Sequence, residues 1–264
     1  MPNKNKKPVL LLVFVGLIAA LAFVMSKLDP NAGPESKPPP KLPRLTVEEA
    51  TTKWPEIVQH VAAPARGNAQ AQYSVVEFGD FECPQCGKMR PIIEDSLKAA
   101  GDRANLYFVH RPFPTIHKYA IVAAQASLEA ADEGKFWPMY DQFYSHQEDL
   151  EPGLYDGYAK AAGADPTKIE AATRDPKLRA RVESDSKFCD SLPVQETPTL
   201  LLRDNTAGKV IAFAAGKDEI LKLLKTAPWA STANATAQAA ATTDSGPKPV
   251  GPAVAASGTS PTSH

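Results

Sequence analysis

Two cysteines are separated by two residues in the stretch FGDFECPQCGKM, residues 78 to 89. Such a pair can supply half of a zinc site, close a structural disulfide or act as a redox pair. Zinc needs further ligands at suitable spacing, but the five histidines form no such pair and Cys189 lies about a hundred residues beyond Cys86. A disulfide closing so short a loop restricts the unfolded chain only slightly. The pattern therefore favours a redox pair, Cys83 and Cys86, with no metal or other cofactor.

The surroundings of the pair agree with redox chemistry. The run QYSVVEF, residues 72 to 78, predicts a buried strand, and Pro84 suits the first turn of a following helix. Cys83 would then face unpaired backbone N–H groups at the helix start, which stabilise a thiolate and lower the thiol pKa. Only the thiolate attacks a disulfide. Cys86, one turn further in, would be sheltered and close enough to resolve a mixed disulfide.

Thr197 and Pro198 form a second candidate feature, at the start of a strand late in the chain. A proline in a strand needs a special reason, because it cannot donate a hydrogen bond to the sheet. If the Thr197–Pro198 bond is cis and lies beside Cys83, the exposed backbone there can pair with an extended substrate.

The remaining pattern predicts an α/β domain with one sheet and a helical insert. A capping box at Thr46 begins a helix, residues 63 to 68 form a loop, and Ile116 shares a helical face with Ala120. The Asp-Pro pairs at 165 and 175 each predict a helix start. The predicted elements are a helix over 46–61, a strand over 72–78, the helix of the cysteines to about 100, a strand over 105–111, helices within 116–192, strands over 197–204 and 209–215, and a helix over 217–224.

The two ends have a different character. Three lysines precede an apolar run over residues 9–25, which predicts that residues 1–25 form a membrane anchor with the body outside the cytoplasm. A signal peptide cleaved after Ala20-Leu21-Ala22 is the alternative, and it leaves a free periplasmic protein. Residues 26–45 are a proline-rich linker, 46–229 the folded domain, and 230–264 a disordered tail poor in apolar side chains. The net charge of −1 argues against a nucleic-acid partner.

Four segments, EFGDFECPQC, FVHRPFPTIHKYA, EGKFWPMYDQF and VQETPTLLL, resemble the DsbA-like thiol–disulfide oxidoreductases of bacterial envelopes. The resemblance implies a thioredoxin fold with a helical insert. It makes Cys83 the attacking cysteine, Cys86 the resolving one and Pro198 a cis-proline preceded by Thr197. It also makes Glu77 a buried acid that relays a proton to or from Cys86; a solvated strand residue is the alternative.

This chain departs from the best-known oxidase of that family between its cysteines. It carries Pro84-Gln85, without the histidine of that oxidase, and the dipeptide tunes the reduction potential. The resemblance implies a monomeric enzyme that oxidises thiols of exported proteins and is reoxidised by a quinone-linked membrane partner. The alternatives are a reductant or isomerase of the same fold, and a non-enzymatic chaperone module that binds substrates.

Predictions can also be made for three other side chains near the motif or in the helical insert. Cys189 lies on an apolar helical stripe and is interpreted as a small buried residue, with a regulatory thiol as the alternative. Phe81, next to the motif, is expected to be partly exposed and to contact unfolded substrates. His117 is expected to begin a helix and to cap it by hydrogen bonding.

Overall fold

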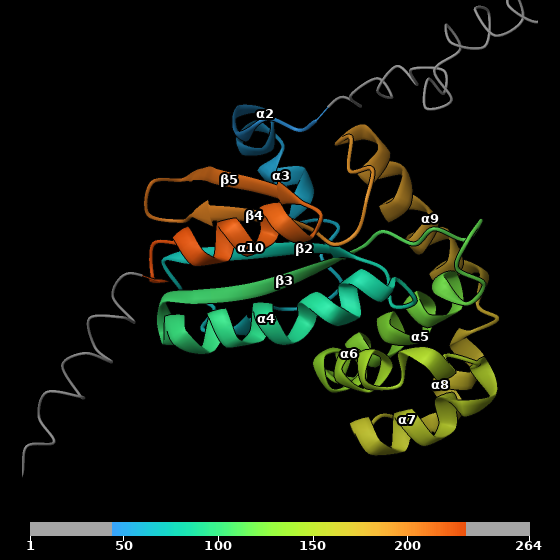
Figure 1. Ribbon diagram of the computed structural model, residues 1–264. Helices are drawn as coiled ribbons and strands as arrows, with labels where there is room; N and C mark the ends of the chain where they lie inside the picture. Colours follow the sequence, from blue (N-terminus) through green and yellow to red (C-terminus); the bar gives the residue numbers. More distant parts are fainter. Residues whose placement is uncertain (1–43, 231–264) are drawn as a thin grey trace, which may run out of the picture. The chain divides into compact units, whose positions relative to one another are not determined.

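The computed structural model describes residues 44–230 of the chain, and Figure 1 shows their arrangement. The predicted anchor, residues 26–43 of the predicted linker and residues 231–264 of the predicted tail lie outside the described residues. Leu45, at the end of that linker, is already buried against the domain. Trp229, near the other end, is buried as well.

A single mixed sheet of five strands forms the centre of the domain, in the order β1-β3-β2-β4-β5. β2 and β3 run parallel, whereas all other neighbouring strands are antiparallel. The strands are β1 (Arg66–Gly67), β2 (Tyr73–Gly79), β3 (Ala104–His110), β4 (Thr199–Asp204) and β5 (Lys209–Ala215).

Helices cover the faces of the sheet, and the insert helices lie beyond one of its ends. In Figure 1 the insert helices α5 to α8 lie near the first turn of α4, beyond the end of the sheet where β2 and β3 finish. The helices are α2 (Val47–Thr52), α3 (Trp54–Ile57), α4 (Pro84–Ala100), α5 (Ala120–Asp132), α6 (Phe136–Ser145), α7 (Tyr155–Ala162), α8 (Pro166–Ala172), α9 (Pro176–Ser191) and α10 (Lys217–Thr226).

The alternation of side chains along β2 divides the core between two faces of the sheet. Val75 belongs to a cluster that includes residues of α4 and α10, whereas Val76 and Phe78 belong to one that includes residues of α2, α3 and α9. Glu77 has the same parity as Val75. The strand therefore directs this carboxyl toward the α4 face.

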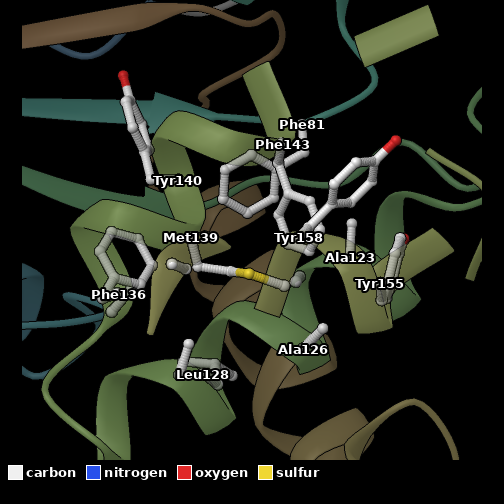
Figure 2. Packing of buried hydrophobic residues seen from close by; sticks show 14 of the residues in the cluster. Phe81, Ala123, Ala126, Leu128, Phe136, Met139, Tyr140, Phe143, Tyr155 and Tyr158 are labelled. Atoms are coloured by element: carbon white, nitrogen blue, oxygen red, sulfur yellow. The ribbon is translucent and has the colours of Figure 1, made fainter. Parts of the chain in front are cut away.

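A third cluster joins the insert to the end of the sheet. Figure 2 shows Met139 and Phe143 of α6 packed with Phe81, which follows β2. The ring centroids of Phe81 and Phe143 lie 5.1 Å apart. The same cluster contains Cys83 and Cys86. The insert core is therefore continuous with the surroundings of the cysteine pair.

Three local expectations are wrong. The helix predicted over 46–61 is broken at Lys53, because Pro55 occupies the first turn of a new helix, α3. Ile116 does not share the buried face of α5: it precedes that helix and is 74% exposed. The loop predicted over 63–68 contains β1, which pairs with β3 and is too short to show a periodic pattern.

Candidate active site

Cys83 is the N-cap residue of α4, where the chain changes from extended to helical backbone. Its backbone N–H donates to the carbonyl of Asp80 at 3.0 Å, and its thiol donates to the carbonyl of Thr197 at 3.3 Å. The residue is 7% exposed. Pro84 and Gln85, which begin the helix, are both exposed. Cys83, the predicted attacking cysteine, is therefore largely buried at the start of α4, next to two exposed residues.

The two cysteines differ in burial and in acidity. The pKa of Cys83 is lowered to about 6, first by the hydrogen bond from the Cys86 thiol. Burial opposes this shift, whereas the Thr197 side chain and the backbone N–H groups of Cys86 and Gln85 add to it. Cys86 is fully buried, and burial raises its pKa well above its usual value. At neutral pH the structure thus provides one thiolate and one thiol.

Glu77 is fully buried on β2, the central strand of the sheet. Its Oε2 accepts a hydrogen bond from the Tyr140 hydroxyl at 3.0 Å, whereas its Oε1 has no hydrogen-bond partner among residues 44–230. Burial raises the pKa of Glu77 to about 8. The alternative of a solvated strand residue is therefore wrong, and the carboxyl is protonated at neutral pH.

Thr197 and Pro198 lie beside Cys83 although more than a hundred residues separate them in the chain. The bond between them is cis. Thr197 is half-buried and Pro198 is buried at the start of β4. The structure thus brings all the site residues predicted from the sequence to one end of the sheet.

Asp80 holds the turn between β2 and α4, a role that only its position after a buried strand could have suggested from the sequence. One carboxylate oxygen accepts from the backbone N–H of Glu82 at 2.9 Å. The other accepts from the N–H of Phe113 at 2.9 Å and contacts Nδ1 of His117 at 2.7 Å. The prediction that His117 begins a helix is therefore wrong. It precedes α5 and connects the loop after β3 to the cysteine turn.

Gln147, in the turn after α6, also holds the cysteine motif. Its side-chain N–H₂ donates to the carbonyls of Phe81 at 2.7 Å and of Cys83 at 2.8 Å. Gly87 makes room for this amide, because a Cβ there would meet Gln147 Oε1. This contact spans 64 residues and has no local pattern, so the sequence did not reveal it.

The secondary expectations have mixed outcomes. Phe81 is 1% exposed and packs among aromatic rings, so its expected exposure to substrate is wrong. Cys189 is fully buried, and burial raises its pKa to about 12, which fits the interpretation as a small core residue. Within residues 44–230 there is no group of three or more His, Cys, Asp or Glu arranged to hold a metal ion.

Comparison with known proteins agrees with this geometry. A family model described as thioredoxin matches residues 59–225. The solved structure of oxidised BdbD from Bacillus subtilis is 26% identical, covers 70% of this chain and 95% of its own, and superposes with a TM-score of 0.52. DsbA2 of Pseudomonas aeruginosa shares the fold, with 21% identity, 61% and 92% coverage and a TM-score of 0.50. The chain therefore belongs to the thioredoxin family, and its fold agrees with the resemblance to the DsbA-like thiol–disulfide oxidoreductases.

A curated relative that matches part of this chain is much longer than the chain and is named as a transporter. The protein called Na⁺/H⁺ antiporter NhaA 1 of Salinispora arenicola is 37% identical over 139 residues, or 52% of this chain. This chain spans about a fifth of that protein, since the match covers 21% of it. The similarity is thus limited to a segment of domain size. Within the part of this chain that the structure describes, no helix is long and apolar enough to cross a membrane.

Proposed function

We propose that this chain is an extracytoplasmic thiol–disulfide oxidoreductase that exchanges disulfides with exported proteins through Cys83. The supporting observation is the pairing of a thiolate-forming Cys83 at a helix start with a buried Cys86 of high pKa. A low pKa makes Cys83 both a good nucleophile at neutral pH and a good leaving group. Thr197 and Pro198 would offer backbone to an extended substrate at this sulfur.

In the oxidising direction, a substrate thiolate attacks Cys83 of the Cys83–Cys86 disulfide. A mixed disulfide forms on Cys83, and Cys86 leaves as a thiolate. Glu77, protonated at neutral pH, donates its proton to that thiolate. A second substrate thiolate then attacks the substrate sulfur of the mixed disulfide and releases Cys83 as a thiolate. Two electrons pass from the substrate to the cysteine pair, and the substrate gains one disulfide.

The direction of electron flow rests on how strongly Cys83 is stabilised. Strongly oxidising DsbA has a cysteine pKa of about 3.5, and thioredoxin has one of about 7. The value of about 6 for Cys83 lies nearer to thioredoxin. Gln85 brings no positive charge to the thiolate. The resemblance to the DsbA-like oxidoreductases supports disulfide donation, our first proposal, whereas this pKa supports the second, a reductant or isomerase of the same fold.

The reduction potential of the Cys83–Cys86 pair tests both, measured against glutathione on the full chain with Cys83→Ser as the inactive control. A potential of about −120 mV, as in DsbA, supports disulfide donation. A potential of about −270 mV, as in thioredoxin, supports delivery of electrons outward and rejects donation. If Cys83→Ser keeps the function of the wild type although it cannot exchange disulfides, both proposals are rejected and the substrate-binding chaperone is left.

The surroundings of the reaction are part of the proposal. A bacterial membrane anchor over residues 1–25 would hold the domain outside the cytoplasm, and cleavage after Ala22 would instead release it into the periplasm. Disulfides persist in either location. A quinone-linked membrane protein would reoxidise the pair, and the chain would act as a monomer. Protease added to spheroplasts tests the anchor. An anchored domain should stay with the spheroplasts and be cleaved, whereas a variant lacking residues 1–25 should be protected.

A further inference from the structure

The helical insert contributes a side chain to the buried carboxyl of the sheet. Tyr140, on α6, is fully buried, and its hydroxyl donates to Glu77 Oε2 at 3.0 Å across 63 residues of sequence. Figure 2 shows this hydroxyl pointing away from the other labelled side chains. Because Oε1 of the same carboxyl has no hydrogen-bond partner among the described residues, Tyr140 engages one oxygen and leaves the other available.

The position of Tyr140 is itself secured by charges. Asp141, the next residue, accepts two hydrogen bonds from the Arg66 guanidinium, at 3.0 and 2.6 Å, and one from Arg90 of α4 at 3.1 Å. Arg66 and Arg90 also share Glu94 of α4, each at 3.1 Å. These four side chains are half-buried. Ion pairs with paired hydrogen bonds are stronger in such an environment than at the surface. α6 is therefore held against both β1 and the helix that carries the cysteines.

We propose that Tyr140 is a positioning residue of the exchange reaction, one that orients Glu77 so that Oε1 exchanges the proton of Cys86. This inference rests on the proposed function, in which Glu77 is the proton relay. It gives the insert a chemical role in addition to packing. The hydroxyl stays protonated, because burial raises the pKa of Tyr140 well above its usual value. Tyr140 thus donates to Glu77 and does not itself transfer the proton.

Several charged or titratable groups act on Glu77 from the elements packed around it. Burial is the largest influence on its pKa, and the Tyr140 hydrogen bond opposes it by favouring the carboxylate. The thiolate of Cys83 and the Glu94 carboxylate favour the protonated form, and Arg90 opposes them. Cys86 and Tyr144 also lie within electrostatic reach of the carboxyl. Of these groups, Tyr140 alone is hydrogen-bonded to it. Removal of its hydroxyl should therefore raise the pKa of Glu77.

The reaction step that reports on this proton is the resolution of a mixed disulfide between Cys83 and glutathione. Cys86 gives its proton to the Glu77 carboxylate and attacks Cys83 Sγ. The Cys83–glutathione bond breaks, the Cys83–Cys86 bond forms, and glutathione leaves as a thiolate. This step requires ionised Glu77, so its rate should rise with pH through the pKa of Glu77.

Tyr140→Phe in the full chain tests the inference, because it removes the hydroxyl and keeps the ring. We expect the infrared carbonyl band of protonated Glu77 to titrate about one pH unit higher than in the wild type. We also expect glutathione release at pH 7 to slow about tenfold, with its pH profile displaced upward by the same interval. Tyr155→Phe is the matched control: its buried hydroxyl donates to the Leu150 carbonyl at 3.1 Å in the same aromatic cluster.

The variant Glu77→Gln distinguishes the role of Tyr140 from that of Glu77. If it lacks the carbonyl band and slows glutathione release while Tyr140→Phe leaves both the band and the profile in place, the role of Tyr140 is overturned and the relay stands. If Glu77→Gln releases glutathione at the wild-type rate, the relay itself is wrong, and the role of Tyr140 falls with it. Equal displacement in Tyr140→Phe and Tyr155→Phe also overturns the inference, because the effect is then one of general packing.

Discussion

Cys83 and Cys86 are one helical turn apart, yet their surroundings shift their pKa values in opposite directions. The first receives hydrogen bonds from the second and from the backbone, whereas the second is enclosed by apolar side chains. This asymmetry followed from the sequence, because Pro84 marked the helix start. The low exposure of Cys83 did not follow, since it depends on residues far away in the chain.

The acidity of Cys83 gives a direct prediction. Its alkylation by iodoacetamide should rise with pH and reach half of its maximum near pH 6, because the thiolate is the reacting form. Mass spectrometry of the peptides measures the site and rate of labelling. Cys86 and Cys189 are buried with raised pKa values and should be alkylated slowly. Rapid alkylation should therefore be absent from Cys83→Ser. A midpoint near 9 would show that the helix start does not stabilise the thiolate.

The elements were predicted where local chemistry is sufficient. The β-branched run of β2 and the N-caps Asp165 and Asp175, whose side chains accept from the N–H groups of Thr167 and Lys177, needed no distant information. β1 was missed because its two residues gain their strand geometry from β3. The first turn of α4 lies between these cases: its start is local, but its attachment to Gln147 is tertiary.

The contact between Gln147 and Gly87 gives a prediction about that first turn. Gln147→Ala should destabilise the protein by about 1–3 kcal/mol, because two half-buried carbonyls lose their donor. Gly87→Ala should also destabilise the wild type, since the new Cβ displaces Gln147. In the Gln147→Ala background the same change should stabilise by about 1 kcal/mol through helix propensity. Urea denaturation of the four proteins measures this cycle, and additive effects would contradict the proposed contact.

The molecule as a whole combines a sheet of common topology with a helical insert that completes its redox site. The order of elements sufficed to predict the sheet and the insert, because consecutive strands and helices tend to be neighbours. It did not reveal Tyr140 above Glu77, or Gln147 on Cys83, because such contacts depend on how the insert rotates onto the sheet. Even so, Tyr140 lies on the buried apolar face of α6, and Asp80 directly follows the buried strand β2.

The buried carboxyl makes the stability of the whole domain depend on pH. Glu77 has a pKa of about 8 in the folded chain and about 4.5 when unfolded. Between these values the unfolded chain loses the proton that the folded chain keeps. The free energy of unfolding should therefore fall as pH rises, by at most about 1.4 kcal/mol per pH unit from this group.

Glu77→Gln should remove this dependence, so the variant should gain stability over the wild type progressively from pH 5 to pH 8. Cys83 acts in the opposite direction in the dithiol protein. Its lowered pKa contributes stability that is fully present above the unfolded value of about 9 and is lost as pH falls through about 6. This contribution is common to both proteins, so the difference between their urea midpoints reports Glu77. A difference that stays constant across this range would mean that Glu77 is already ionised in the folded protein, and it could not then donate a proton to Cys86.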